Sequence, residues 1–361
     1  MLFSAMIFGF GILAFAHPAH AISMNERRKL AQLPKFTLAS ILNGTYFTDL
    51  ETFMLDQFPW RDRFLHIKAF NQFYIYNIKD NHNIFIKNGT AVAISYPFTA
   101  GADVLAARKM TALIDTYFQD MAVFVSIIPD KAYYLAAQNG YPAIDYDKIQ
   151  ENIHKGCAQA TWISIFDTLT ADDYYRTDSH WRQECLQPSV ARLLGDLGRN
   201  WVPAAYEHHD LYPFYGVYCG QSSLPLTPDT LTYVTCDLLD HAIVYRCTAN
   251  SQSLAQAALY EPDMIGKNDP YDLFLGGACS VIVLENPQHQ GDGKELYLFS
   301  DSFGRSIAPL LLEGYSRVTL IDIRYIRSSR LPELIQYKSG SDVLFLYSIE
   351  TLAIASSLNT D

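Results

Sequence analysis

Basic side chains are outnumbered in this sequence. Its 361 residues include 27 Lys and Arg against 38 Asp and Glu, which gives a formal net charge of −11 at pH 7. A surface that follows nucleic-acid phosphates needs clustered Lys and Arg, and we find no basic stretch of that kind. The composition therefore argues against nucleic acid as a partner.

Motifs for nucleotides and metals are also missing. The sequence has no P-loop and no GxGxxG pattern, and none of its cysteines belongs to a CxxC pair. The segment Glu207-His208-His209-Asp210 carries metal-capable side chains, but adjacent residues rarely face one ion, so a solvated turn is the simpler interpretation. We expect neither a cofactor nor a metal.

The six cysteines leave disulfide formation open. In an exported chain, six cysteines allow up to three disulfides in 15 connectivities. Cys236 and Cys247 flank a strand-like stretch and are the first pair to test. Free thiols are equally compatible with the sequence.

The longest apolar run stands at the N-terminus and is short for a membrane span, which needs roughly 20 residues. Residues 1–16 are almost wholly apolar, no charged residue occurs in the first 21 positions, and Ala19-His20-Ala21 has the small-x-small form of a signal-peptidase site. We interpret residues 1–21 as a signal peptide or membrane anchor, which predicts an extracytoplasmic protein, secreted or anchored to the cell envelope. A buried apolar helix in a cytosolic protein is the alternative.

The rest of the chain predicts an α/β fold with a helical N-terminal lead-in. Helical periodicity over residues 45–55 and 63–77 gives a lead-in over residues 22–83, packed on the main domain of residues 84–361. In that domain a helix over residues 102–119 precedes an apolar strand, and such strands, covered on both faces, are typical of a mostly parallel sheet in an α/β/α sandwich. Residues 201–269 lack a clear period and read as a middle insertion. The expected strands are residues 84–87, 121–128, 280–284, 296–299, 318–323 and 343–347.

Two short segments together carry the three side chains that a serine nucleophile requires. Ser302 lies in Ser300-Asp301-Ser302-Phe303-Gly304, between a strand and a helix, where open α/β sheets bind ligands. Asp178 and His180, two residues apart in Asp178-Ser179-His180-Trp181, form a carboxylate–imidazole pair if they point the same way. A serine hydroxyl needs such an imidazole and carboxylate to become nucleophilic. The alternatives are a simple helix cap at residues 300–302 and a surface loop at residues 178–181.

The two segments resemble the DHHW-type bacterial proteins, which are related to extracytoplasmic alginate O-acetyltransferases in the SGNH hydrolase-like superfamily. Further blocks are similar to the family in the same order, so the resemblance spans almost the whole chain after the signal. These blocks are residues 25–31 with Pro34, residues 56–62, Pro129-Asp130-Lys131, Tyr271 with residues 274–277, and residues 321–325.

The resemblance implies an exported O-acetyltransferase or acetylesterase of three-layer SGNH-like fold that acts on hydroxyl groups of cell-surface or extracellular polysaccharide. Ser302 would attack the acyl carbonyl, His180 would carry the proton, and Asp178 would orient the imidazole. A membrane-bound O-acyltransferase would be the partner of an otherwise monomeric protein. The alternative is a catalytically silent carbohydrate-binding or scaffold protein of the same system.

The remaining candidates concern the substrate and the oxyanion. We expect Trp181 and Tyr271 to contact substrate, Gly277 to support the oxyanion hole, and Arg324 to hold an anionic or hydroxyl-rich ligand or else to pair with a carboxylate. The chain departs from the family pattern at Ser300, where Gly is usual, and at residue 278, where Ala stands in place of Asn.

Overall fold

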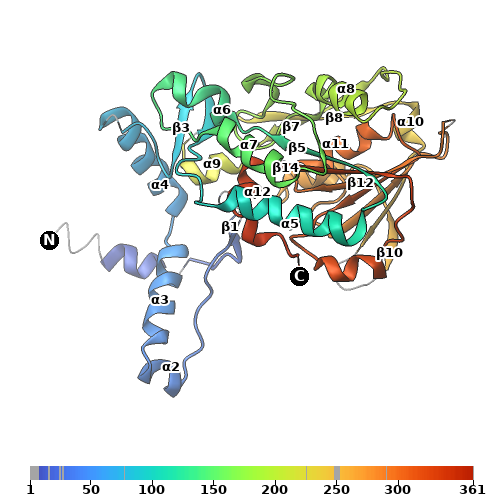
Figure 1. Ribbon diagram of the computed structural model, residues 1–361. Coiled ribbons are helices and arrows are strands. Elements are labelled where there is room, and N and C mark those ends of the chain that lie inside the picture. The colour runs from blue at the N-terminus through green and yellow to red at the C-terminus, as the bar shows by residue number, and fades with distance from the viewer. Residues whose placement is uncertain are drawn as a thin grey trace.

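An eight-stranded sheet forms the centre of the molecule (Figure 1). The computed structural model describes residues 8–14, 17–23, 26, 28–76, 78–224, 226–247, 253–289 and 291–360. The strand order is β10-β9-β11-β13-β12-β14-β5-β6. The bounds are β5 (Ala122–Ile128), β6 (Thr161–Trp162), β9 (Ile243–Cys247), β10 (Leu254–Ala257), β11 (Val281–Glu285), β12 (Glu295–Ser300), β13 (Arg317–Ile321) and β14 (Asp342–Ser348).

Both faces of this sheet are buried. In β12, Leu296 and Leu298 belong to one hydrophobic cluster and Tyr297 and Phe299 to the other, because successive side chains of a strand point to opposite faces. The first cluster packs against α8 (Gln187–Asp196) and α11 (Gly304–Leu311). The second packs against α5 (Ala102–Tyr117), α7 (Tyr146–Gly156) and α12 (Ile349–Ala353). The predicted three-layer α/β/α arrangement is confirmed.

Strand direction places one edge of the sheet where a site is expected. The pairings that join β13, β12, β14, β5 and β6 are parallel, so the carboxyl ends of these strands share one edge. β11, β9 and β10 extend the sheet beyond β13 with antiparallel pairings. Ser302 follows β12, which lies between β13 and β14 in the parallel part, and therefore lies at the shared carboxyl edge.

The segment from residue 201 to residue 269 contributes both to this sheet and to a separate hairpin. Its strands β9 and β10 complete the sheet, while β7 (Glu207–Phe214) and β8 (Asp229–Thr235) pair with each other. A second hairpin joins β3 (Ile84–Lys87) and β4 (Thr90–Ala93). The other elements are α6 (Lys131–Leu135), α9 (Val217–Ser222), α10 (Asp237–Asp240) and 3-10 turns at Ala137–Asn139, Ala171–Asp173, Gln183–Cys185, Pro262–Met264, Pro270–Leu273, Ser328–Glu333 and Ala355–Ser357.

The N-terminal arm, residues 28–76, corrects one prediction. Figure 1 shows α2 (Leu38–Leu42) and α3 (Thr45–Asp56) extending away from the sheet, and neither helix has a buried residue. The apolar period of α3 is present in the sequence, but the helix is not packed on the main domain. The arm continues through α4 (Arg61–Phe70) and a π-helix (Asn71–Ile75).

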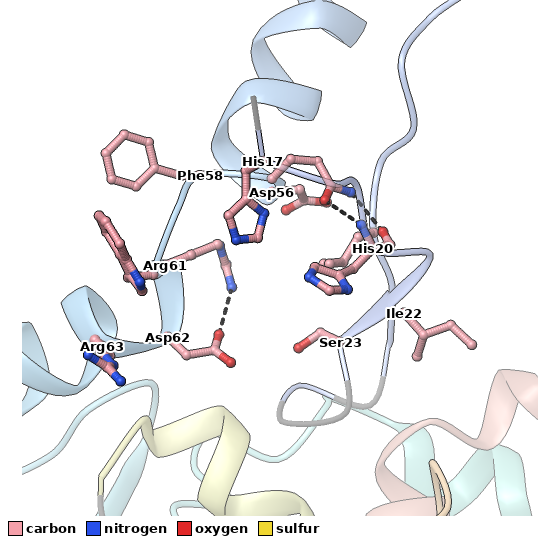
Figure 2. A pocket seen from close by; sticks show the side chains of 12 residues that line it. His17, His20, Ile22, Ser23, Asp56, Phe58, Arg61, Asp62 and Arg63 are labelled. Carbon is pink, nitrogen blue, oxygen red and sulfur yellow. Dashed lines mark hydrogen bonds and ion pairs between the residues drawn. The ribbon is translucent and has the colours of Figure 1, made fainter. Parts of the chain in front are cut away.

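Two of the family-like blocks bind each other at the base of this arm. Arg28 donates to both oxygens of Asp56 at 2.9 and 2.6 Å, and Arg61 donates to Glu26 at 2.7 Å. Figure 2 shows the cavity beside these residues, with His20 and Asp56 among its lining. All of the described lining lies between residues 17 and 63, so these blocks hold the arm together and are remote in sequence from Ser302. The short strands β1 (Ile22–Ser23) and β2 (Arg28–Lys29) pair beside them.

Residues 1–7 and 15–16 of the predicted signal, and Asn25 and Arg27 of the first family-like block, lie outside the described residues. In the described part of the chain, no helix is both long and apolar enough to cross a bilayer. Among the described residues, which include all six cysteines, no disulfide joins Cys236 and Cys247 or any other two cysteines.

Candidate active site

The turn that carries Ser302 is fastened to the neighbouring strand by Asp301. One oxygen of the Asp301 carboxylate accepts the backbone N–H of Phe303 at 3.0 Å, which fixes the turn. The other oxygen accepts the backbone N–H of Ser348 at 2.9 Å and its hydroxyl at 2.6 Å. Asp301 is buried, so these hydrogen bonds tie the start of α11 to the end of β14 and set the position of Ser302.

Ser300, which departs from the family pattern, fits without strain. Its φ is not positive, and its hydroxyl donates to the carbonyl of Leu346 in β14 at 2.6 Å. The space that its side chain needs is left by Gly304. A Cβ at position 304 would lie 2.6 Å from the Cβ of Ser300 and 2.8 Å from Cδ1 of Leu320. Ser300 and Gly304 are therefore sterically complementary.

We expect Gly304→Ala to lower the free energy of unfolding by about 1–3 kcal/mol, the usual cost of overpacking a core. Combining it with Ser300→Gly removes the closest contact, so the double variant should recover part of that loss. Urea unfolding of the two single variants and the double variant gives the coupling free energy. Additive effects would show that the two positions do not compete for the same space.

Asp178 and His180 lie on a hairpin-like segment whose ends are paired. Tyr174 forms an antiparallel bridge with Trp181, and the backbone N–H of Tyr175 donates to the carbonyl of His180 at 3.1 Å. Within the segment, the backbone N–H of His180 donates to the Asp178 carboxylate at 3.2 Å. This local hydrogen bond, typical of Asp in turns, turns the Asp178 carboxylate toward the His180 backbone.

The structure brings Asp178, His180 and Ser302 together. His180 Nδ1 lies 2.6 Å from Oδ1 of Asp178, and His180 Nε2 lies 2.8 Å from Oγ of Ser302. The Asp178 side chain is fully buried, whereas His180 is partly exposed. Each imidazole nitrogen thus has one partner, in the order of a serine–histidine–aspartate triad.

Residues that the sequence did not single out hold Asp178 in place. The second carboxylate oxygen of Asp178 accepts the backbone N–H of Val217 at 2.8 Å. Gly216 approaches so closely that a Cβ there would lie 2.1 Å from the carbonyl oxygen of Thr177. Asp229 accepts the Thr177 hydroxyl at 2.6 Å and the Thr177 N–H at 2.7 Å. These contacts come from the middle segment, whose sequence carried no periodic signal.

Trp181 and Tyr271 support His180 rather than lining an open site. Both side chains are fully buried, which excludes the expected contact with substrate in this conformation. The Tyr271 ring stacks on the His180 imidazole with centroids 3.8 Å apart and an interplanar angle of 13°. Ser306 Oγ accepts Trp181 Nε1–H at 2.8 Å and the Tyr271 hydroxyl at 2.9 Å. One hydroxyl on α11 thus orients both aromatic side chains around the imidazole.

Lys131 is a buried cation behind the same hairpin. Its Nζ donates to the carbonyl of Tyr175 at 2.8 Å, and the side chain is 2% exposed. Burial lowers the pKa of Lys131 to about 7, against the attraction of nearby carboxylates, of which Asp178 contributes most. Lys131 therefore clamps the backbone of the hairpin and adds positive charge near Asp178 when it is protonated.

The Lys131 pKa predicts a pH-dependent stability. The native lysine loses its proton near pH 7 and the unfolded one near pH 10.5, so the unfolded state binds more protons between these values and stability rises with pH there. The free energy of unfolding of the native sequence, relative to Lys131→Met, should increase by about 2–3 kcal/mol from pH 7 to pH 9.5. Urea unfolding at both pH values measures it. Lys155→Met, at an exposed lysine, is the control. If the difference in free energy of unfolding between the native sequence and Lys131→Met does not change with pH, the lowered pKa of Lys131 is contradicted.

A small cavity opens beside Ser302. Its volume, measured as the space open to the centres of water-sized molecules, is about 20 Å³. Its lining combines apolar groups with two guanidinium groups: Ala278, Cys279, Ile282, Asp301, Ser302, Arg305, Leu320, Asp322, Arg324 and Tyr325. Arg305 is held by Asp272 at 2.7 Å, and Arg324 pairs with both oxygens of Asp322 at 2.9 and 2.7 Å. The expected carboxylate partner of Arg324 is present, and Arg324 also faces the cavity.

Gly277, which we expected to support the oxyanion hole, is not one of the unoccupied backbone donors at this cavity. The N–H of Gly277 points to the carbonyl of Phe274 at 3.4 Å, and a Cβ at residue 277 would collide with Asp272, so Gly277 serves a tight turn. By contrast, the N–H groups of Ser302 and Ala278 form no hydrogen bond with another described residue. Both residues line the cavity, which leaves these N–H groups as the oxyanion donors to consider.

The structure does not group the metal-capable residues of positions 207–210. They form part of strand β7, where successive side chains point to opposite faces. His209 is bound to the hydroxyl of Thr235 at 2.8 Å. Within the described ranges, no group of three or more His, Cys, Asp or Glu side chains is arranged to hold a metal ion.

The sequence matches the model of one known protein family over most of its length. The model of the DHHW protein family matches residues 26–94 and 109–321. No curated protein is similar enough to the chain to count as a match.

Two solved structures with TM-scores above 0.5 share the fold, and a third similarity is weaker. A DHHW family protein from Eubacterium siraeum has a TM-score of 0.61 at 16% identity, covering 77% of this chain and 95% of that chain. Bacillus cereus PatB1, solved with a sulfonyl adduct, has a TM-score of 0.58 at 15% identity, covering 77% of this chain and 98% of that chain. The O-acetyltransferase domain of Pseudomonas putida AlgJ has a TM-score of 0.45 at 12% identity, covering 75% and 92%.

Proposed function

Because the chain belongs to the DHHW family, and because its fold presents a serine, a histidine and an aspartate in hydrogen-bonded order, we propose that it is an O-acetyltransferase or acetylesterase. Its substrates are hydroxyl groups of cell-surface or extracellular polysaccharide. The single observation that carries this proposal is the 2.8 Å distance between His180 Nε2 and Ser302 Oγ. A nucleophile and its base must lie within hydrogen-bond reach, and these two residues are 122 positions apart in sequence.

The proposed reaction proceeds through an acetyl-serine. His180 Nε2 takes the Ser302 proton as Oγ attacks the acetyl carbonyl carbon, and the imidazolium is stabilised by the buried Asp178 carboxylate. When the tetrahedral intermediate collapses, the bond to the leaving oxygen breaks and His180 returns the proton to it. A glycan hydroxyl or water then gives its proton to His180 as it attacks the acetyl-serine carbonyl. When this second intermediate collapses, the bond to Ser302 Oγ breaks and His180 returns the proton to Oγ, which releases the product and restores Ser302.

The size and polarity of the cavity fit an acetyl group. The space open to the centres of water-sized molecules is only about 20 Å³, which favours a small acyl group over a longer chain. The N–H groups of Ser302 and Ala278 are the proposed oxyanion donors, at a cavity that is also lined by Arg305, which pairs with Asp272. One well-placed donor of this kind stabilises the transition state by roughly 3 kcal/mol.

We further propose that the protein works outside the cytoplasm as a monomer. The uncharged N-terminal segment supports export or anchoring, and a membrane-bound O-acyltransferase that supplies acetyl groups is the partner implied by the family resemblance. Location outside the cytoplasm is tested by expressing the chain with and without residues 1–21 and fractionating the cells.

Hydrolysis of p-nitrophenyl esters of increasing acyl length tests the proposed activity. The purified chain should cleave the acetate and show at least tenfold lower kcat/KM for the butyrate and octanoate. Adding a hydroxylated oligosaccharide should divert acetyl groups to the sugar, detected by mass spectrometry. No turnover of any ester, together with retained glycan binding, would favour the catalytically silent alternative.

A sulfonyl fluoride provides a second test that needs no turnover. Such reagents are attacked by activated serine hydroxyls, and Bacillus cereus PatB1 has been solved with a sulfonyl adduct. The intact mass of this chain should increase by one sulfonyl group, with the label on Ser302.

A further inference from the structure

A groove rich in arginine adjoins the Ser302 cavity. Within the seven residues 324–330 the chain has three arginines, and residues 323–332 contain no acidic residue. The groove offers about 420 Å³ to the centres of water-sized molecules. Its described lining consists of Arg324, Tyr325, Ile326, Arg327, Arg330 and Asn359.

The groove and the Ser302 cavity share part of their lining. Arg324 and Tyr325 line both, so a polymer bound in the groove lies within reach of Ser302. The fold explains this position, because the loop that carries the arginines follows β13 at the carboxyl edge of the sheet, directly beside the turn that follows β12. The side chain of Tyr325 is 56% exposed and presents its ring to this surface.

The charge of the groove is only partly compensated. Arg324 is neutralised by its bidentate pair with Asp322, and Arg330 lies 3.3 Å from Glu333 on the exposed surface. Arg327 is exposed and forms no ion pair with any other described residue. The groove therefore concentrates positive charge on a chain whose formal net charge is −11, the opposite of what the composition predicts for an average surface.

We propose that this groove binds the anionic groups, carboxylate or phosphate, of a polysaccharide acceptor and so presents its hydroxyls to Ser302. This inference rests on the proposed function and names its substrate class. Guanidinium groups are suited to the task, because they donate two parallel hydrogen bonds to a carboxylate or phosphate and stay charged at any physiological pH. A neutral glycan would leave the Arg327 guanidinium without an anionic partner and would gain nothing from the local positive charge.

Binding of matched oligosaccharides to the intact chain, without an acetyl donor, tests the proposal. Calorimetry compares oligogalacturonate with its methyl ester, which keeps the sugar rings and removes the charge, and uses a glycerol-phosphate oligomer as the phosphate arm. We expect at least tenfold tighter binding of one or both anionic oligomers than of the methyl ester. That preference should shrink as salt rises from 50 to 500 mM, because exposed charges are screened.

Paired variants locate the effect. Arg327→Gln with Arg330→Gln should weaken binding of the anionic oligomer about tenfold and leave the methyl ester unchanged. Arg192→Gln with Arg317→Gln changes the net charge equally at residues that line neither cavity, and should preserve the preference. Hydrolysis of p-nitrophenyl acetate should be unchanged in both double variants, because neither touches Ser302 or His180.

The outcomes separate this proposal from the proposed function. Equal binding of charged and methylated oligomers, or an equal loss in the two double variants, overturns the anionic groove even if the acetate is hydrolysed normally. Conversely, a charge preference that depends on Arg327 and Arg330 stands even if Ser302 proves inactive. The arm that binds, carboxylate or phosphate, identifies the anionic group.

Discussion

Replacing Ser302 with alanine is expected to lower kcat for p-nitrophenyl acetate by about 10⁴- to 10⁶-fold, because no other group can form the acetyl ester. The Ser302 hydroxyl is 2.8 Å from His180 Nε2, and no second serine is hydrogen-bonded to that nitrogen among the described residues. The same substitution should abolish labelling by a sulfonyl fluoride, which intact mass spectrometry measures. Residual turnover would reflect binding and oxyanion stabilisation alone.

The control for Ser302→Ala is the same serine-to-alanine substitution at a position away from the site. Ser316→Ala removes a hydroxyl just before β13, at the opposite edge of the sheet, where it donates to the carbonyl of Lys294. Its kcat should match that of the native sequence. If Ser302→Ala retains more than about one tenth of the native kcat while both variants fold, Ser302 is not the nucleophile.

Replacing Asp178 with asparagine is expected to lower kcat by about 10³- to 10⁴-fold with little change in KM. The two side chains have nearly the same shape, but the carboxylate accepts hydrogen bonds from His180 Nδ1 and the Val217 N–H, and an amide nitrogen cannot accept either. An amide that donates to Nδ1 leaves the proton on Nε2, the nitrogen that must accept the Ser302 proton. An amide is also uncharged and stabilises the imidazolium less.

Stability and labelling separate this catalytic effect from misfolding. The Tm of Asp178→Asn should stay within a few degrees of the native value, and its sulfonyl labelling rate should fall in parallel with kcat. Asp172→Asn, at an exposed aspartate near the same hairpin, is the matched control and should keep native kcat. A native kcat in Asp178→Asn would show that this carboxylate does not orient His180.

Much of the fold was predictable because its strands are locally distinct. The apolar stretches at residues 296–299 and 343–347 are too short and too uniformly apolar for surface helices, and they became β12 and β14, buried on both faces. The antiparallel strand β10 was missed, and β9 was indicated only as a strand-like stretch between Cys236 and Cys247, since neither sequence shows an alternation that marks one buried face. The arm was misplaced for a different reason: helical periodicity in α3 identifies an apolar face, not what covers it.

The candidate site also contains residues that the sequence identifies and residues that only the structure identifies. Asp178, His180 and Ser302 were recognisable because their chemistry is written in short segments and their order resembles a family. The roles of the residues that hold them were not recognisable, and this includes Lys131, although it belongs to a family-like block. Val217, Asp229, Lys131 and Ser306 act through contacts with residues tens of positions away or more. Such contacts leave no local pattern. Burial likewise reassigns Trp181 and Tyr271 from substrate contact to support of the imidazole.

The sequence by itself determined which reactive groups the chain owns, that its strands alternate with helices, and that its net charge is negative. The tertiary structure alone decided that His180 Nε2 and Ser302 Oγ lie 2.8 Å apart, and that three arginines gather beside them on a negatively charged protein. The physical reason is that hydrogen bonds and local fields depend on distances of a few ångströms. Those distances are fixed by tertiary packing, since His180 packs against Phe303 beside Ser302 and the arginine loop follows β13 beside β12, which no single segment encodes.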